Sequence, residues 1–193
     1  PRDMENNFLD IIITETDRMT HIVQDLLTLS RLDAGSTEMV FTRFPFHDAI
    51  ESVVRSNSLN AKQRGHELTY VPEGELPLIT GDRSRLEQVM MNVIGNAVKY
   101  TPDGGHIRVT AGSEGETVWM EVADDGIGIP EADRSRIFER FYRVDKSHSK
   151  EVGGTGLGLS IVKHAAQYHG AKIELKSDPG KGTAIAVNFT AAK

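Results

Sequence analysis

The sequence predicts an α+β fold, a two-layer α/β sandwich in which helices cover one face of a mixed sheet, preceded by one long helix. Two observations lead to this prediction. Strand-like and helix-like segments follow one another in groups, without strict β-α-β alternation. Before them, residues 5–33 repeat apolar side chains with the period of a helix. The 193 residues are enough for one ordinary domain with a short appendage.

The long helix predicted over residues 5–33 carries an apolar stripe. Spacings of 7, 3, 4 and 3 residues, as in a coiled-coil seam, separate Ile12, Met19, Ile22, Leu26 and Leu29. The seam is widened toward the face that a helical bundle needs by Ile11, Val23 and Leu27. The alternative is a helix that packs on its own domain. Because Gly35-Ser36-Thr37 follows as a hinge-like break, we expect one unit at 1–35 and another at 36–193.

The remaining elements follow from the apolar period, which is two in strands and near 3.6 in helices, and from turn residues. In chain order we expect a strand at 39–43, a helix at 47–63 after Pro45, strands at 67–71 and 77–80, a helix at 82–99, strands at 106–111 and 117–123, a helix at 156–169, and strands at 172–177 and 183–189. Turn-forming residues at 101–105 end the helix at 82–99, and a tight turn at 178–182 joins the last two strands.

Composition and charge exclude several classes of protein. Hydrophobic residues make up 38% and charged residues 26% of the chain, which is typical of a soluble globular protein. The net charge of −6 comes without a basic stripe, so we expect no nucleic-acid partner. The absence of cysteine excludes a disulfide scaffold and cysteine-ligated zinc. No apolar run approaches the roughly 20 residues of a membrane span.

Two amides and a cation share one face of the helix predicted at 82–99. Asn92, Asn96 and Lys99 are spaced by four and three residues, and Tyr100 follows them. The neighbouring positions are apolar, so the helix is largely buried and its polar side chains need partners. An amide oxygen can ligate a divalent cation, and a lysine can meet a phosphate. The alternative is a pair of asparagines bonded to neighbouring backbone.

A glycine-rich loop follows the strand predicted at 117–123. It reads Asp124-Asp125-Gly126-Ile127-Gly128-Ile129-Pro130. A carboxylate at the end of a strand can accept a hydrogen bond from an exocyclic amine, and glycines permit close approach of a ligand. The alternative is an ordinary Asp-Gly turn. A calcium-binding loop is excluded, because Ala123 and Ala132 stand where that loop needs oxygen ligands.

A second glycine-rich segment runs into the helix predicted at 156–169. It reads Gly153-Gly154-Thr155-Gly156-Leu157-Gly158-Leu159-Ser160. Glycines at the start of a helix expose N–H groups toward an anion, and the helix dipole adds to the attraction. The glycine spacing does not match the dinucleotide-binding fingerprint. The absence of a following Gly-Lys-Ser/Thr excludes a P-loop.

These segments, in this order, resemble the catalytic domain of sensor histidine kinases, which has the Bergerat-type ATP-binding fold shared with gyrase, Hsp90 and MutL. Residues 88–102 resemble the N box of that family, 124–128 its first glycine box, 137–143 its F box, and 154–158 its second glycine box. The resemblance covers residues 1–193 nearly end to end. Residues 141–146 and 153–155 look most like those of phosphate-sensing and cell-wall-sensing membrane kinases.

The resemblance implies roles for the matching residues. Asn96 would ligate Mg²⁺ on the phosphates of ATP, with Asn92 beside it. Lys99 and Tyr100 would contact phosphate and nucleoside, and Asp124 would accept a hydrogen bond from the adenine amino group. The other nucleotide-binding residues would be Gly126, Gly128, Ile129, Gly154, Thr155, Gly156, Leu157 and Gly158. Residues 140–153 would form a mobile lid. The candidate catalytic residues are Asn92, Lys99, Arg140 and Arg143, of which either arginine could stabilise charge on the transferring phosphoryl group.

The helix at 5–33 resembles the second helix of the family's dimerisation and phosphoacceptor hairpin. The first helix of that hairpin carries the H box, roughly His-Glu-Leu-Arg-Thr-Pro. None of the seven histidines stands in such a motif; His66-Glu67-Leu68 imitates its start, but Thr69 follows. We therefore expect no autophosphorylation by this chain alone. The expected partners are ATP, a phosphoacceptor helix of its own or a sister chain, and a response regulator receiver domain. The resemblance also implies a homodimer and a cytoplasmic domain of a membrane-anchored protein.

Three other functions fit parts of the pattern. An ATP hydrolase of the gyrase or Hsp90 kind would place a glutamate base where this chain has Asn92, and an amide cannot take a proton from water. A serine-directed anti-sigma kinase would also want an acid near position 92 and would not need the long helix. A nucleotide-binding interaction module without catalysis would not need to retain Asn96, Asp124 and the glycines.

Overall fold

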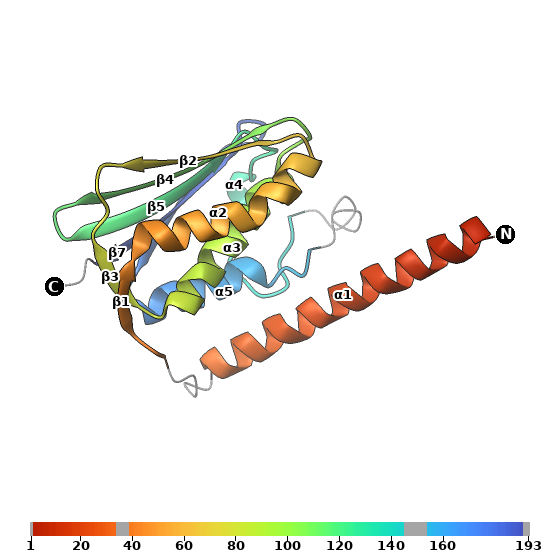
Figure 1. Cartoon of the computed structure of the whole chain (residues 1–193), viewed down its shortest axis with the longest axis horizontal. Helices are drawn as coiled ribbons and strands as arrows, with labels where there is room; N and C mark the ends of the chain where they lie inside the picture. The colour runs from red at the N-terminus through yellow and green to blue at the C-terminus, as the bar shows by residue number, and fades with distance from the viewer. Residues whose placement is uncertain (1, 34–38, 145–153, 191–193) are drawn as a thin grey trace.

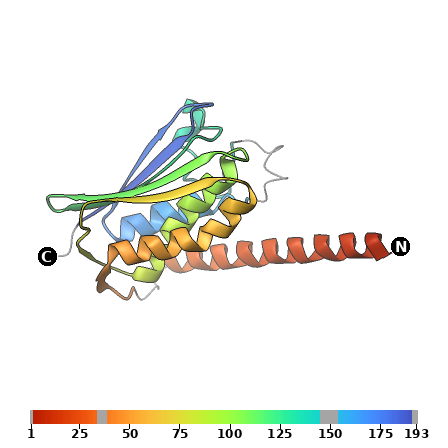
Figure 2. The same ribbon diagram turned by 45° about the horizontal axis from the view of Figure 1, so that its top comes forward.

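The structure, a computed structural model, describes residues 2–33, 39–144 and 154–190. It is a two-layer sandwich in which three helices cover one face of a five-stranded sheet, with the long helix α1 (Arg2–Asp33) beside the helical layer (Figures 1 and 2). This arrangement confirms the fold class that the sequence predicts. The hinge-like residues 35–37 and the expected boundary between the two units lie outside the described residues.

The large sheet is mixed. Its strands, in spatial order, are β2 (Glu67–Glu73), β4 (His106–Glu114), β5 (Thr117–Asp124), β7 (Thr183–Thr190) and β6 (Lys172–Ser177). Strands β2 and β4 run parallel, and the other neighbours are antiparallel. A separate two-stranded sheet pairs β1 (Thr42–Pro45) with β3 (Leu78–Gly81). Pro72 is tolerated in β2 because an edge strand needs N–H donors on one side only.

The helices pack on the sheet through a continuous apolar core. Helices α2 (Phe46–Gln63), α3 (Arg83–Tyr100) and α5 (Gly158–Tyr168) cover its inner face. The alternating inward residues of the two central strands are fully buried: Ile107, Val109, Ala111, Val118, Met120 and Val122. They share one core with the buried side of α3, which consists of Leu86, Val89, Met90, Val93, Ile94, Ala97 and Val98. Helix α3 is therefore held along its whole length, and its remaining polar side chains have fixed positions.

Most element boundaries agree with the prediction to within a few residues, and the differences at β1 and α5 have clear physical reasons, while one short helix was not predicted. The strand predicted at 39–43 begins only at Thr42, because its partner strand β3 ends at Gly81, opposite Thr42. Before Thr42, the Val40 N–H donates to the Asp82 carboxylate at 3.2 Å and not to a strand. The helix predicted at 156–169 begins at Gly158, since Gly156 has a φ of +71° that no α-helix allows. A four-residue helix, α4 (Glu131–Arg134), was not predicted.

Among the described residues, helix α1 contacts the sandwich through its C-terminal half. Leu29, which is 1% exposed, forms a small apolar cluster with Leu157 and Ile161 of the α5 region. The N-terminal half extends beyond the sandwich (Figures 1 and 2), where Phe8 and Ile12 are exposed. The alternative of a helix packed on its own domain therefore holds for one end of α1. The side chain of Ile11 lies outside the described set.

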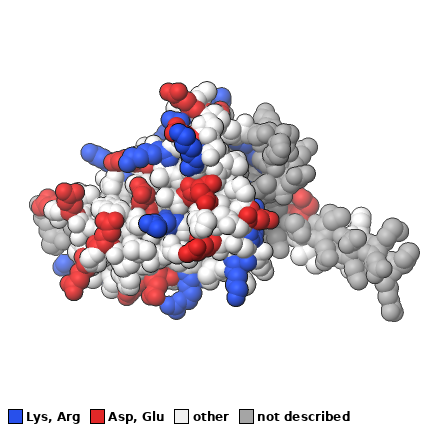
Figure 3. Space-filling model, turned by 90° about the horizontal axis from the view of Figure 1, so that it is seen from above, with Lys and Arg blue, Asp and Glu red and all other residues white. Residues whose placement is uncertain are grey.

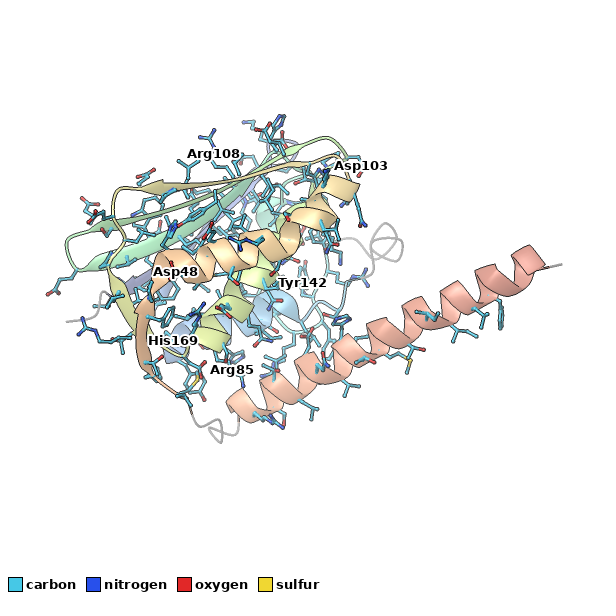
Figure 4. All side chains as sticks on the ribbon, in the orientation of Figure 1. Asp48, Arg85, Asp103, Arg108, Tyr142 and His169 are labelled. Carbon is cyan, nitrogen blue, oxygen red and sulfur yellow. The ribbon has the colours of Figure 1, made fainter. Side chains whose placement is uncertain are left out.

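The surface carries charges of both signs. The face of the molecule shown in Figure 3 intersperses acidic and basic side chains. Arg108 belongs to this outer side of the sheet, since its neighbours Ile107 and Val109 point into the core (Figure 4). Within the described residues, no helix has both the length and the apolar character needed to cross a membrane.

Candidate functional site

A cavity of about 660 Å³ lies between α3, the ends of β5 and β7, the start of α5, and α1. It brings together the three clusters that the sequence singles out. The predicted residues in its wall are Asn92, Asn96, Lys99, Tyr100, Asp124, Gly128, Ile129, Arg143, Gly154, Thr155, Gly156 and Gly158. These residues come from the three clusters and, with Arg143, from a fourth segment, so the cavity is a product of the fold.

The polar face of α3 supplies the floor of the cavity. Asn92 Nδ2 donates a hydrogen bond to the Gly158 carbonyl at 3.2 Å, which ties α3 to the first residue of α5. The alternative of asparagines bonded to neighbouring backbone is thus correct for this amide group. The Asn96 side chain accepts and donates no hydrogen bond among the described residues. The Lys99 ammonium lies 5.3 Å from the centre of the Tyr100 ring.

Asp124 lies at the C-terminal end of β5, at the inner end of the cavity. The N–H groups of Gly126 and Thr183 both donate to its Oδ1 atom, at 2.9 and 3.2 Å. No described residue donates to Oδ2, which is therefore available to a ligand. Burial raises the pKa of this carboxyl group, while the two N–H groups act in the opposite direction. Asp124 thus has one carboxylate oxygen held by backbone N–H groups and one without a described donor, in a partly apolar pocket. This arrangement suits recognition of an amino group.

The loop after Asp124 is fixed by close backbone contacts. A Cβ atom on Gly126 would lie 2.7 Å from the Tyr100 carbonyl oxygen, so a side chain there would push the loop away from α3. Gly128 has a φ of +68°, and a Cβ atom on it would overlap the Asp178 carbonyl group. The N–H of Ile127 donates to the Tyr100 carbonyl at 3.2 Å. The loop is thereby locked between the end of α3 and the β6–β7 turn.

The second glycine segment leads from the cavity into α5. The Gly156 carbonyl accepts a hydrogen bond from the Phe141 N–H at 2.9 Å, which joins this segment to the end of the F box. The Thr155 hydroxyl accepts from the Leu157 N–H and donates to Asp25 Oδ2 of α1, both at 3.2 Å. This hydroxyl therefore connects the loop at the start of α5 with the long helix.

Some predicted site residues lie at the border of the cavity or outside it. Arg143 is part of its wall, whereas Arg140 is not, and the Nη2 atom of Arg140 lies 3.4 Å from His164 Nε2. The Leu157 side chain is buried in the apolar cluster with Leu29. Gly126 shapes the site through its hydrogen bond to Asp124 rather than as a wall residue. Of the predicted lid, residues 145–153 lie outside the described residues.

The structure adds residues that the sequence reasoning missed. Thr183 holds Asp124, and its place directly after the glycine-containing turn at 178–182 was the signal that the sequence offered. Arg64 donates to the Val98 and Lys99 carbonyls at 2.6 and 2.9 Å and pairs with Asp103, which is marked in Figure 4. Arg64 thus donates hydrogen bonds to carbonyls at the end of α3 that have no partner within the helix. The contact joins residues more than thirty positions apart, so no local pattern indicates it.

Asp25 of α1 is a further cavity residue that was missed. It stands three residues after Ile22 and four before Leu29, on the side of α1 that faces α5. A carboxylate between two residues of the apolar stripe was a signal that the sequence offered. Burial raises the pKa of Asp25, and the hydrogen bond from Thr155 partly offsets this effect.

Comparison with known sequences gives a consistent result. Residues 81–193 match the family described as histidine kinase-, DNA gyrase B-, and HSP90-like ATPase. The chain is 36% identical over 186 residues to the sensor histidine kinase WalK of Bacillus subtilis. This alignment includes 95% of the chain but only 30% of WalK, so the chain spans less than a third of that relative's length.

Solved structures with the same fold are also histidine kinases. Full-length ShkA in complex with AMPPNP matches 97% of the chain, with a TM-score of 0.83 and 29% identity, over 39% of the ShkA chain. Histidine kinase ThkA in complex with the response regulator protein TrrA matches 96% of the chain, with a TM-score of 0.75 and 25% identity, over 51% of that chain. Both matches extend over nearly all of the chain, so they include the long helix as well as the sandwich.

Proposed function

We propose that this chain, which belongs to the histidine kinase-, DNA gyrase B- and HSP90-like ATPases and within them to the catalytic domains of sensor histidine kinases, binds ATP with Mg²⁺ and transfers the γ-phosphoryl group to a histidine side chain. The observation that carries this proposal is the cavity itself. It combines an open carboxylate oxygen at one end with amide, ammonium and glycine-loop groups at the other.

The inner end of the cavity suits adenine. Asp124 Oδ2 is free to accept a hydrogen bond from the exocyclic amino group, while Oδ1 is held by backbone. The wall there is otherwise apolar, with Val93, Ala97 and Ile185. An apolar wall with one oriented acceptor favours an aminopurine over a base that presents a carbonyl at the same place, because the carboxylate would repel that carbonyl.

The other end suits the phosphates. Asn96 offers an amide oxygen that no described residue engages, and oxygen ligands are what Mg²⁺ prefers. The bound ion would neutralise charge on the phosphates and bring them into line for transfer. Lys99 and Arg143 provide positive charge in the same wall, and the N-terminus of α5 adds N–H groups.

The reaction needs positioning and charge stabilisation rather than a protein base. A neutral imidazole nitrogen attacks the γ-phosphorus; a nitrogen–phosphorus bond forms as the bond to the β–γ bridging oxygen breaks, and ADP leaves. Asn92 stands where a hydrolase would need a carboxylate, and its amide is bonded to the Gly158 carbonyl. Water attack therefore lacks a base at position 92, which favours the kinase over an ATP hydrolase of the gyrase or Hsp90 kind.

Phosphoryl transfer to a separate acceptor tests the proposal. Incubated with labelled ATP and Mg²⁺, the chain should label an added hairpin fragment that carries an H box, and should stay unlabelled when it is alone. Asn96→Ala should lower nucleotide affinity at least about tenfold, because a ligand of the ion is lost. Asn60→Ala on the exposed side of α2 is the matched control and should behave as the unaltered chain does.

Gly126→Val provides a second, independent variant. Its side chain would displace the loop that holds Asp124, so adenine binding should be lost while α3 stays intact. Acid-labile phosphate on a histidine of the chain alone would contradict the absence of an acceptor. Unchanged affinity and transfer in both Asn96→Ala and Gly126→Val would contradict the assignment of the site.

Transfer of the phosphoryl group to a response regulator receiver domain would be the next step of the whole protein. The ThkA complex contains a response regulator protein, which supports this part of the proposal. Dimerisation through a completed helical hairpin, phosphorylation within or between chains, and anchoring of the whole protein in a membrane are further predictions from the family resemblance.

A further inference from the structure

One wall of the cavity comes from the long helix rather than from the sandwich. Asp25 of α1 lines the same cavity as Asn92, Lys99 and Gly158. Its Oδ2 atom accepts a hydrogen bond from the Thr155 hydroxyl at 3.2 Å. Two residues later, Leu157 is buried against Leu29 of α1. The glycine segment is thus clasped by α1 through one polar and one apolar contact, and the polar contact lies inside the cavity.

The position of this carboxylate matters because of its charge. In the proposed function Asp124 binds the base, and the phosphates lie toward the glycine segment that contains Thr155 and leads into α5. A carboxylate at that end of the cavity carries a negative charge that can interact with the same positive groups as a phosphate. The carboxylate and the phosphate also repel each other, because both are anions. Charged groups of the described cavity wall are Lys99, Arg64, Arg143, Asp124 and Asp25. Asp25 adds one negative charge to this set.

We propose that Asp25 makes the site discriminate between nucleotides: while α1 is docked, its carboxylate disfavours a triphosphate more than a diphosphate, so that ATP binding and the docking of α1 weaken each other. This inference rests on the proposed function, since it assumes that nucleotide phosphates occupy this end of the cavity. Linkage makes the coupling reciprocal. A triphosphate releases α1 from the glycine segment, and loss of the γ-phosphoryl group on transfer allows α1 to dock again.

Affinity measurements on the whole chain test this discrimination. Isothermal titration with MgAMPPNP and with MgADP gives two dissociation constants for each variant. Asp25→Asn keeps an oxygen that can accept from Thr155 but removes the charge. It should tighten MgAMPPNP binding on the order of threefold to tenfold and MgADP binding clearly less, and the difference should shrink as salt is added. Glu15→Gln is the matched control, because it removes the same charge from an exposed position of α1.

Leu29→Ala separates docking from charge. It keeps the carboxylate but removes the apolar contact with Leu157 and Ile161, so α1 should leave the cavity and MgAMPPNP affinity should rise as in Asp25→Asn. The position of α1 can be measured directly, because the chain has no cysteine of its own. Spin labels on Gln24→Cys and Lys163→Cys should report a longer, broader distance distribution with MgAMPPNP than with MgADP.

The outcomes separate the inference from the function on which it rests. An equal effect of Asp25→Asn on both nucleotides, or no effect, overturns the inference while the proposed function stands. Weaker MgAMPPNP binding in Asp25→Asn also overturns it, because the carboxylate would then help to hold the ion. Failure of the unaltered chain to bind either nucleotide would instead contradict the proposed function.

Discussion

Individual residues in this site depend on contacts that only the folded chain creates. The sequence assigns Gly128 to close approach of a ligand, whereas the structure places the Asp178 carbonyl where its side chain would be. Gly182 is similar, since a Cβ atom there would overlap the Asp124 carbonyl. The motif therefore predicted that glycine is needed at such a position, but it did not predict the backbone packing that requires glycine there. In both cases the glycine lets two loops pack together, and this packing positions Asp124.

His106 and Asp125 form an exposed pair next to Asp124. The His106 N–H donates to Asp125 Oδ1, and His106 Nδ1 lies 2.8 Å from Oδ2. The hydrogen bond with Asp125, and then its charge, raise the pKa of His106. The backbone and side-chain hydrogen bonds from His106 lower the pKa of Asp125. Each partner thus favours the charged form of the other.

The sign of both shifts predicts a pH window of stability. The contribution of His106 to the free energy of unfolding is fully present below about pH 6.5, which is its pKa in the unfolded chain. This contribution is lost as the pH rises through the raised pKa of the folded state. The contribution of Asp125 to the free energy of unfolding is present above about pH 3.9, its pKa in the unfolded chain, and is lost as the pH falls through the lowered pKa of the folded state. His106→Gln should therefore lower the urea midpoint near pH 5.5 and change it little at pH 9. Asp125→Asn should abolish the same pH dependence, and parallel midpoint curves for all three proteins would refute the coupling.

Among helices and strands, type was easier to predict than extent. Apolar periodicity identified α2, α3 and the strands of the large sheet, because burial against one core imposes that period. The ends were set by long-range hydrogen bonds. The Asp82 carboxylate accepts a hydrogen bond from the Val40 N–H before β1 begins. The Gly156 carbonyl accepts one from the Phe141 N–H before α5 begins. Such partners are dozens of residues apart or belong to another loop, so no local pattern reports them.

Helix α1 predicts association of the chain with itself. Its exposed apolar residues are Phe8, Leu9, Ile12, Ile13, Met19, Val23, Leu26 and Leu27. Covering a stripe of this size with a second apolar helix lowers the free energy relative to leaving it in water. Sedimentation velocity should show a larger species as concentration rises. Ile12→Glu should shift the chain toward monomer, while Gln24→Glu, which adds the same charge off the stripe, should not; equal association of both variants would contradict this role of the stripe.

The molecule as a whole assembles the site from distant segments. Sequence motifs identified the three clusters, but only the fold shows that Asn96, Asp124 and Thr155 line one cavity. Sequence reasoning also treated α1 as a separate unit, and so it missed Asp25 in the cavity wall. These gaps have one cause: distances between segments are set by packing of the two layers, which no local pattern encodes.

Because the cavity is shared by both layers, a nucleotide should stabilise the entire sandwich. Ligand at 100 times its dissociation constant stabilises the folded state by about 2.7 kcal/mol. For a chain of this size that corresponds to a rise of roughly 5 to 10 °C in the unfolding temperature. Scanning calorimetry with MgAMPPNP should show this rise, and Asn96→Ala should show a much smaller one. An equal rise in that variant would place the nucleotide elsewhere.

The parallel pairing of β2 with β4 has a consequence for how the chain reaches this structure. All of β3 and α3 lies in the connection between these two strands, so closing the sheet at this edge also encloses the helix that carries Asn92 and Asn96. A long connection loses much chain entropy before its strands can pair. We therefore expect β2 and β4 to pair in the same step that encloses α3, so that this edge of the sheet and the nucleotide site assemble together.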